Sequence, residues 1–191
     1  METINTKTKI LFFLFTISVF SCKAQQLPLN TSLKNIPMNA YVKDLNNELY
    51  QYTGAYKTNF QGKEIILHIT KEENKLMDYG DQKFYRDALV IKYIVKNSSG
   101  TVLQDTKNNA TSKIDFFSIG TKPDQNKITF SYSGTNCNVG WGKIILKKIN
   151  DTQISWEYRP NDIILDDSKC PPGTDINIYL PETKDLIFTK Q

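Results

Sequence analysis

Apolar and polar residues alternate at every second position along much of the chain, a pattern typical of strands with one buried face. In the segments around Thr129 and Ser155 the opposite face is polar. Antiparallel sheets show this alternation, whereas buried parallel strands are apolar throughout. Four sets of apolar residues share a face in this way: Ile65, Leu67 and Ile69; Leu89, Ile91, Tyr93 and Val95; Ile128, Phe130 and Tyr132; and Ile154, Trp156 and Tyr158.

Short turn signals separate the alternating segments, so neighbouring strands are expected to pair in space. These signals lie at residues 59–62, 97–100 and 150–151. About eight antiparallel strands close a small barrel, and closure removes exposed sheet edges. We therefore predict an all-β fold, a single antiparallel meander barrel. Its strands are predicted near residues 50–59, 63–71, 88–96, 101–105, 127–133, 141–149, 153–159 and 185–190, with shorter pieces near Ile114 and Ile176.

The N-terminal part of the chain has the order of an export signal, with a basic leader, an apolar run at 10–20 and a small residue before Cys22. The run is shorter than the roughly 20 residues that span a bilayer. Residues 19–22 resemble the bacterial lipobox, in which the cysteine receives a diacylglyceryl group. We expect lipidation at Cys22. The alternatives are a secretory signal cut near Ala24 and an apolar core segment.

This signal divides the chain into a signal peptide at 1–21, a flexible tether at 22–39 and a β-barrel domain at 40–191. The tether is predicted because its residues are polar and include two prolines. A short helical turn is predicted to follow from Asn39 as its cap. The domain is large enough to fold alone.

Charge and composition exclude two classes of protein. The ten Tyr, ten Phe and two Trp are too many aromatic residues for a disordered chain, and they favour strands. The net charge of +4 includes +1 from residues 1–21, which leaves +3 for the remainder. Without a dense basic block beyond Lys147 and Lys148, or a recognition motif, no nucleic-acid partner is expected.

The other two cysteines, Cys137 and Cys170, form a pair once Cys22 is assigned to lipid. In an oxidising compartment we predict a disulfide between them. The chain-entropy treatment gives about 3.8 kcal/mol for closing a loop of about 34 residues. Two free thiols are the alternative. No metal site is expected, because neither cysteine has another Cys or His nearby in the sequence.

Residues 52–57 and 64–69 resemble the opening hairpin of lipocalin-like (calycin) barrels. Tyr56 stands at the position of the Trp in the Gly-x-Trp pattern of those barrels. The arginine that packs over that Trp has no clear counterpart, and Lys184 and Lys190 are the nearest basic residues. The resemblance implies an eight-stranded lipocalin-like architecture.

A second resemblance extends over nearly the whole chain. The residues that carry it are 20–25, Leu45, Glu48 and Leu49, Tyr85-Arg86-Asp87, Trp156, Leu180-Pro181, and Leu186, Phe188 and Lys190. In these residues the chain resembles small uncharacterised lipoproteins of Bacteroidetes-type bacteria, classed as a domain of unknown function. The resemblance implies no activity. It implies an outer-membrane lipoprotein, and without an Asp or an acidic cluster after Cys22 we expect the periplasmic face.

Residues with catalytic chemistry are few, and no enzyme is predicted. His68 is the only histidine, and no Gly-x-Ser-x-Gly elbow accompanies it, so an ordinary strand histidine is expected. Multi-histidine zinc sites are excluded by this count. The acidic residues around Cys170 match no calcium loop and favour a solvated loop. These acids are Asp162, Asp166, Asp167 and Asp175.

Glycine and tryptophan residues gather near Cys137 without forming a phosphate-binding motif. Gly134, Gly140 and Gly142 lack the Gly-Lys-Ser/Thr ending, so we predict a flexible loop and a strand kink at the barrel rim. Trp141 and Trp156 are predicted in core or rim packing rather than as sugar platforms.

Two functions remain. The first is a binding module that holds a small apolar ligand in the barrel, with Tyr56, Trp141 and Trp156 lining the interior or the rim. The second is an envelope interaction or inhibitor module with a filled barrel. A barrel packed solid by aromatic side chains would exclude the first. No cofactor is expected, and the partners would be a membrane through the lipid anchor and either the ligand or an envelope protein.

Overall fold

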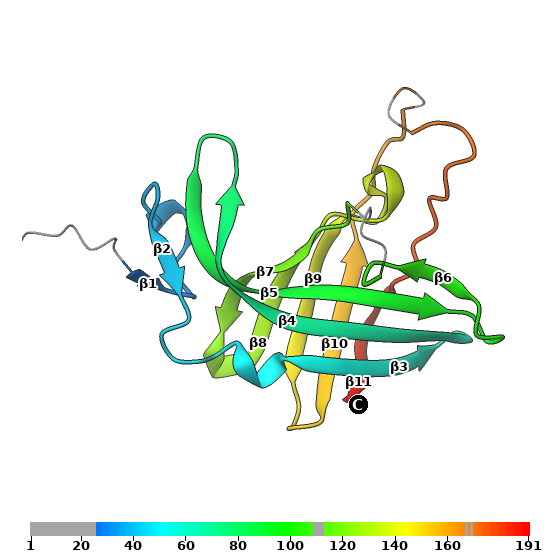
Figure 1. The fold of residues 1–191 in the computed structure, drawn as a ribbon, viewed down its shortest axis with the longest axis horizontal. Coiled ribbons are helices and arrows are strands. Elements are labelled where there is room, and N and C mark those ends of the chain that lie inside the picture. The colour runs from blue at the N-terminus through cyan, green and yellow to red at the C-terminus, as the bar shows by residue number, and fades with distance from the viewer. Residues whose placement is uncertain (1–25, 109–112, 167, 169) are drawn as a thin grey trace, which may run out of the picture.

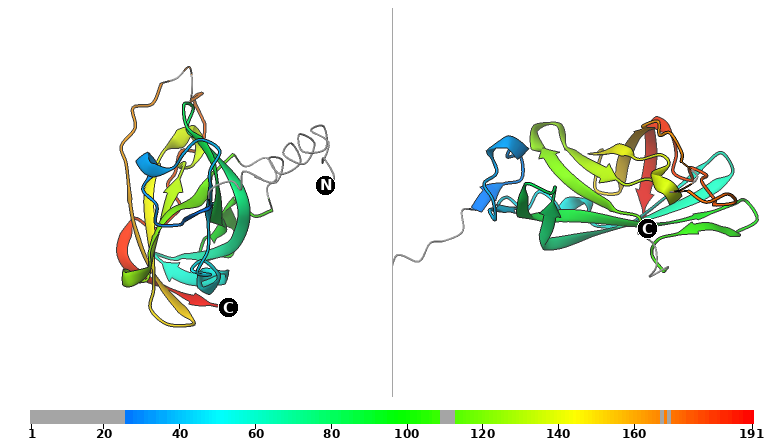
Figure 2. Two further views of the ribbon diagram at one scale, coloured as in Figure 1. Left: turned by 90° about the vertical axis from the view of Figure 1, so that its left-hand side faces the viewer. Right: turned by 90° about the horizontal axis from the view of Figure 1, so that it is seen from above.

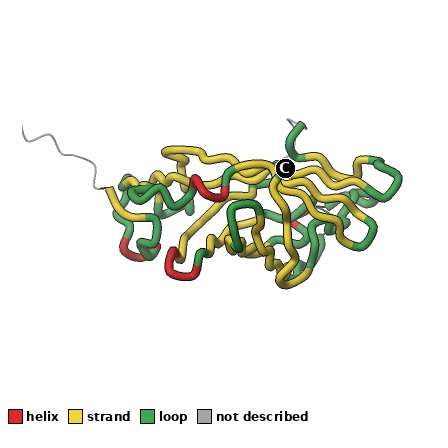
Figure 3. Tube along the Cα trace, turned by 90° about the horizontal axis from the view of Figure 1, so that it is seen from below, coloured by secondary structure: helices red, strands yellow, loops and turns green. Residues whose placement is uncertain are grey.

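A computed structural model describes residues 26–108, 113–166, 168 and 170–191. Within these residues, eleven strands form one sheet, and the helical segments are four short 3-10 turns. Figure 3 shows the strands and the short helical segments along the chain. No helix in the described part of the chain is long and apolar enough to cross a membrane. The strands are β1 (Gln26–Pro28), β2 (Tyr41–Lys43), β3 (Gly54–Phe60), β4 (Lys63–Asp78), β5 (Lys83–Lys96), β6 (Val102–Asp105), β7 (Phe116–Lys122), β8 (Lys127–Tyr132), β9 (Gly142–Lys148), β10 (Gln153–Pro160) and β11 (Thr183–Lys190). The 3-10 turns are η1 (Leu33–Asn35), η2 (Tyr50–Tyr52), η3 (Pro123–Gln125) and η4 (Asn136–Asn138).

Eight of these strands close into an antiparallel barrel of lipocalin-like form, as predicted (Figure 1). The order around the barrel is β3, β4, β5, β7, β8, β9, β10 and β11, a meander apart from β6. Two pairings close it: β3 with β11, and β5 with β7 through Val90 and Phe117. The strands β1, β2 and β6 lie outside this circuit.

The faces predicted from alternation are the buried faces. Every apolar residue of the four sets is at most 2% exposed. The predicted turns also form, and the first of them places Gln61 and Gly62 at positive φ between β3 and β4. The alternation at every second residue therefore predicted correctly which side chains face the interior of the barrel.

Three strand predictions differ from the structure. Residues 102–105 form β6, which pairs at the edge of β5 and is not a barrel strand. The missing barrel strand is β7, predicted only as a short piece near Ile114, and a register shift between Ser118 and Gly120 interrupts its alternation. No strand forms around Ile176.

The chain before the barrel is packed, where a free tether was predicted. In the described part of 22–39, β1 pairs with β2, and the side chains of Leu29 and Ile36 are buried. The helical turn predicted from Asn39 is wrong in position, because Tyr41–Lys43 is a strand and the 3-10 turn is Tyr50–Tyr52. Apolar contact with the barrel outweighs the polar composition of the segment.

We call this region the wing: residues 26–44 together with the outer part of the β4–β5 hairpin, residues 73–87. The hairpin extends beyond the barrel because β4 runs to Asp78 and β5 starts at Lys83. The wing lies at one end of the longest axis of the molecule (Figures 1 and 2). The loops around the two described cysteines lie toward the other end.

The hairpin that resembles those of lipocalin-like barrels contacts a basic residue of the last strand. Lys190, in the last strand, places its Nζ 5.8 Å from the centre of the Tyr56 ring. Gly54 lies beneath this lysine, and a Cβ on Gly54 would stand 2.6 Å from its Cε. The Tyr56–Lys190 contact thus takes the place of the Trp–Arg pair that the sequence lacks.

Candidate functional site

The barrel interior is filled by aromatic side chains. Phe116 of β7 packs against four other rings, with centroid separations of 5.3 to 6.4 Å. These rings come from β5, β8 and β10, so side chains from different walls meet inside the barrel. They belong to Tyr93, Phe130, Tyr132 and Trp156.

Hydroxyl groups inside the barrel are hydrogen-bonded to one another and to the rim. The Tyr93 hydroxyl donates to Gln104 Oε1 at 2.7 Å and lies 2.9 Å from the Tyr132 hydroxyl. Gln104 in turn donates to Thr135 Oγ1 at 2.9 Å. Burial raises the pKa of Tyr132 to about 12, so the phenol stays neutral. Because these polar groups are paired, the core needs no ligand to satisfy them.

The structure separates the three residues predicted to line a ligand. Tyr56 and Trp156 are core residues, 1% and 0% exposed, and the Trp156 indole N–H donates to the Pro181 carbonyl at 2.9 Å. Trp141 lies at the rim and is 44% exposed. Only Trp141 is therefore available to an external molecule.

A disulfide organises the rim around Trp141. The Sγ atoms of Cys137 and Cys170 are 2.04 Å apart, at bonding distance, and the two Cα atoms are 5.5 Å apart. Asn136 adds a second link, donating to the Asp175 carbonyl at 2.7 Å. We call residues 134–141, 161–166 and 170–179 the disulfide-linked end.

The glycines predicted as a flexible loop form a tight turn. Gly140 has φ +75°, and a Cβ there would lie 2.9 Å from the Tyr158 hydroxyl, which donates to the Gly140 carbonyl. Gly134 has φ +89°, and its Cβ would lie 2.6 Å from the carbonyl carbon of Asn138. Close backbone approach, rather than phosphate binding, explains these glycines.

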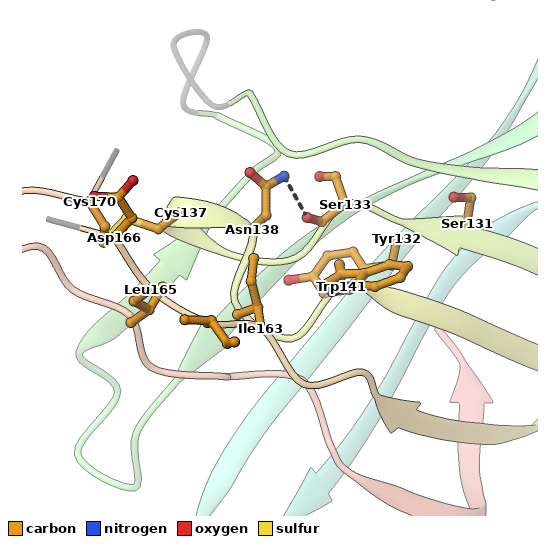
Figure 4. Close-up of a pocket in the computed structure, with 11 residues that line it drawn as sticks. Ser131, Tyr132, Ser133, Cys137, Asn138, Trp141, Ile163, Leu165, Asp166 and Cys170 are labelled. Atoms are coloured by element: carbon orange, nitrogen blue, oxygen red, sulfur yellow. Dashed lines mark hydrogen bonds between the residues drawn. A yellow bond between two sulfur atoms is a disulfide. The ribbon is translucent and has the colours of Figure 1, made fainter. Parts of the chain in front are cut away.

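A surface pocket of about 520 Å³ lies between this turn and the segment at 163–166 (Figure 4). Trp141 and Ile163 both line this pocket, and the side-chain amide of Asn138 donates to the Ser133 carbonyl (Figure 4). A second pocket, of about 460 Å³, shares Trp141 and continues over the outer face of β9 and β10. Both hollows are on the outside of the barrel.

Apolar side chains project from the disulfide-linked end into solvent. Ile164 is 96% exposed, with Ile163 and Leu165 at about 40%. Asp162 and Asp166 lie beside them, and the sequence of this loop also contains Asp167 and Lys169. An exposed apolar group with an acidic border is a candidate protein-binding surface.

The wing contains a buried carboxylate network that was not predicted from the sequence. Asp87 is 1% exposed and accepts hydrogen bonds from the Tyr41 hydroxyl and from the backbone N–H groups of Asp44 and Asn74. Burial would raise the pKa of Asp87, but these bonds and the charge of Lys71 lower it below the usual value.

Asp44 continues the network, accepting from the N–H groups of Glu48 and Leu49 and from Lys71 at 3.3 Å. The adjacent Arg86 is buried and donates to the Leu29 carbonyl at 3.0 Å. The hydrogen bonds to Asp87 thus join the two parts of the wing. The contacts of Asp44 link the wing to Glu48, Leu49 and Lys71 outside it.

The only histidine in the sequence, His68, is expected to be an ordinary strand residue. His68 lies on β4, faces away from the core and is half-buried. Burial and the nearby Lys107 lower the pKa of this histidine. Within the described ranges, no three His, Cys, Asp or Glu side chains are placed to hold a metal ion. Cys22 and Asp167 lie outside the described residues.

The comparison with protein families supports one part of the whole-chain resemblance, a family of unknown function. A family of unknown function, DUF6705, matches residues 6–191. The chain belongs to this family. No curated protein and no solved structure matches the chain. Membership of DUF6705 assigns no activity, so the function has to be argued from the barrel, the disulfide-linked end and the wing.

Proposed function

We propose that this protein is an exported, lipid-anchored member of its family that binds another envelope protein through the disulfide-linked end. The observation that carries this proposal is the group of exposed apolar side chains at 163–165, on a loop that a disulfide holds at the rim of the barrel. Ile164 is 96% exposed, although Cys170, further along the same loop, is held by the disulfide. Large exposed apolar groups are uncommon on proteins without partners.

The chemistry of the surface defines the partner. Asp162 and Asp166 flank the apolar residues, and Trp141 supplies an aromatic side chain of the kind that dominates binding energy at interfaces. A fitting partner presents an apolar segment bordered by Lys or Arg. Because the acidic border is exposed, increasing salt should slow association more than it speeds dissociation.

Lipidation at Cys22 is tested by metabolic labelling. The protein and its Cys22→Ala variant are expressed with labelled palmitate, and only the parent is expected to incorporate the label. Cys137→Ser is the matched control, since it removes a cysteine that the proposal does not assign to lipid. Equal labelling of the parent and Cys22→Ala would remove the anchor from the proposal.

The binding surface is tested by placing a photoreactive amino acid at position 164 of the full-length protein in its bacterial host. A discrete crosslinked adduct is expected from this position. It should be absent when the photoreactive group is at position 187, an exposed isoleucine on the barrel wall. Reversing Asp162 and Asp166 to Lys should abolish the adduct. Identical adducts from both positions would contradict the proposal.

The alternative, a small apolar ligand inside the barrel, has its own measurement. Native mass spectrometry of the purified protein would detect a retained small molecule, and fluorescent lipid probes would report an accessible apolar interior. We expect neither, because aromatic rings from β5, β7, β8 and β10 occupy the interior. A retained ligand of fixed mass would favour the alternative.

A further inference from the structure

A second apolar surface lies on the wing, at the end of the molecule away from the disulfide-linked end (Figure 1). Leu33, Met38 and Tyr79 are each about half exposed. Leu33 and Met38 belong to the segment after β1, and Tyr79 belongs to the turn of the β4–β5 hairpin. Two segments far apart in sequence therefore contribute to one apolar region.

Hydrogen bonds fix these segments to each other. The side-chain amide of Gln82 donates to the carbonyls of Leu33 at 3.1 Å and Ile36 at 2.8 Å. The backbone N–H of Asn39 donates to the Lys83 carbonyl at 2.8 Å. The exposed residues thus form a preformed surface, and a contact there needs little further ordering of the chain.

The length of chain between the proposed anchor and the wing decides what covers this surface. Cys22 precedes Gln26, the first residue of β1, by four positions. Four residues reach at most about 14 Å even when fully extended. A lipid attached to Cys22 would therefore hold β1 and the wing beside the membrane.

We infer that the wing rests on the lipid bilayer, with Leu33, Met38 and Tyr79 in the interfacial region, and so directs the disulfide-linked end away from the membrane. This inference rests on the proposed lipid anchor. Amphipathic side chains such as Tyr are favoured at the boundary between acyl chains and headgroups. A lipid chain combined with a second contact also gives a more stable attachment than one signal alone.

The contact is apolar rather than electrostatic. Lys83, the basic residue beside the hairpin turn, is paired with Asp78 at 2.8 Å. Lys34 and Asp81, which are both exposed, oppose each other in charge. Attachment through the wing should therefore depend little on salt or on the content of anionic lipid.

Tryptophan quenching by brominated lipid tests the orientation. The lipidated full-length protein is reconstituted in phosphatidylcholine vesicles with and without bromine on the acyl chains. Leu33→Trp should lose about half of its added emission in brominated vesicles, as expected for an interfacial indole. Met38→Trp provides a second position. Val102→Trp is the matched control, since Val102 is equally exposed but lies on β6, away from the wing.

The native tryptophans supply an internal control, because Trp141 is at the disulfide-linked end and Trp156 is in the core. Their emission should be unaffected by bromine. Vesicle flotation distinguishes a failure of the lipid anchor from a failure of the contact between the wing and the bilayer. If the purified parent does not float with vesicles, the lipid anchor is wrong and the inference falls with it. If it floats but neither wing variant is quenched more than Val102→Trp, the anchor stands and the wing does not contact the bilayer.

Discussion

The wing and the disulfide-linked end are both irregular segments attached to the same barrel, but they are held in different ways. The wing buries Leu29, Ile36 and Val42 and is fixed by hydrogen bonds to Asp87 and Asp44. The disulfide-linked end leaves most of its apolar side chains exposed, and a covalent bond joins two of its segments, one from each side of β9 and β10 in the sequence.

The difference shows what each segment can contribute to its own stability. A segment that buries apolar area against the barrel is stabilised by that burial, and its polar groups then need partners. A segment that keeps Ile164 in solvent buries little apolar area, so burial does not offset the entropy lost when the segment is ordered. The disulfide reduces this entropy loss instead, because it restricts the unfolded chain. The two regions should therefore respond to different perturbations.

Removal of the disulfide is expected to have the largest effect. The Cys137→Ser, Cys170→Ser double variant should lose about 3 to 4 kcal/mol of unfolding free energy, the amount that the chain-entropy treatment gives for this separation of 33 residues. Denaturant unfolding measures the change. Reductant should shift the parent equally and leave the variant unchanged. An unshifted midpoint in the variant would show that the loop is ordered without the bond.

Replacement of Asp87 should act on the wing alone. Asp87→Ala removes the acceptor for the Tyr41 hydroxyl and two backbone N–H groups, which should cost about 2 to 3 kcal/mol. Hydrogen exchange should rise across 26–44 and 73–87 and stay unchanged at the disulfide-linked end. Thr129→Ala on the barrel wall is the control. Uniform protection loss across the barrel would contradict an independent wing.

Acid should open the wing without breaking the disulfide. The folded pKa of Asp87 is lowered, so its contribution is fully present above the unfolded value of about 3.9 and is lost as the pH falls through the folded pKa. The hydrogen-exchange protection factors of the wing, which are corrected for the intrinsic pH dependence of amide exchange, should therefore be constant from about pH 5 to 7 and fall below about pH 4. Asp87→Asn should flatten this response. A loss of protection at low pH confined to the disulfide-linked end would contradict the assignment of the acid-sensitive contacts to the wing.

High pH should weaken the hydrogen bond between Tyr41 and Asp87, because it ionises the tyrosine hydroxyl. Burial and the hydrogen bond to Asp87 raise the pKa of Tyr41, so its contribution holds below the unfolded value of about 10 and is lost at higher pH. Tyr41→Phe should remove this alkaline transition in the wing. Tyr50→Phe, which changes an exposed tyrosine, is the control.

The smallest effects on stability are expected at the two exposed surfaces. Leu33→Asp and Ile164→Asp should each change the unfolding free energy by less than about 0.5 kcal/mol, because neither side chain is buried. They should separate in function, with Leu33→Asp altering membrane orientation and Ile164→Asp altering partner binding. A destabilisation above about 2 kcal/mol would show a packing role for the residue concerned.

Most of the barrel could be predicted from the sequence because alternation is a local property of a strand with one buried face. The strands that contain Leu67, Tyr93, Phe130 and Trp156 all follow this pattern. The outer β4–β5 hairpin could not be predicted, since residues 71–83 are mostly charged or polar and show no apolar period. Strand β7 was obscured by the irregularity between Ser118 and Gly120.

The candidate sites were predicted less well. The sequence assigns Trp141 and Trp156 alike to core or rim packing, because nothing local distinguishes the exposed Trp141 from the fully buried Trp156. Asp87 was noted only within a family mark, because its role depends on N–H groups 43 and 13 residues away in sequence. The exposed Ile163–Leu165 segment carries no sign in the sequence that its side chains remain in solvent.

The sequence by itself determined the antiparallel strands, their buried faces and the turns between them, because each depends on residues that are close in the chain. Only the tertiary structure decided that Tyr56 pairs with Lys190, that rings from four strands fill the interior, and that residues 26–39 pack as a wing. These features depend on contacts between distant segments, and such contacts exist only after the barrel has closed.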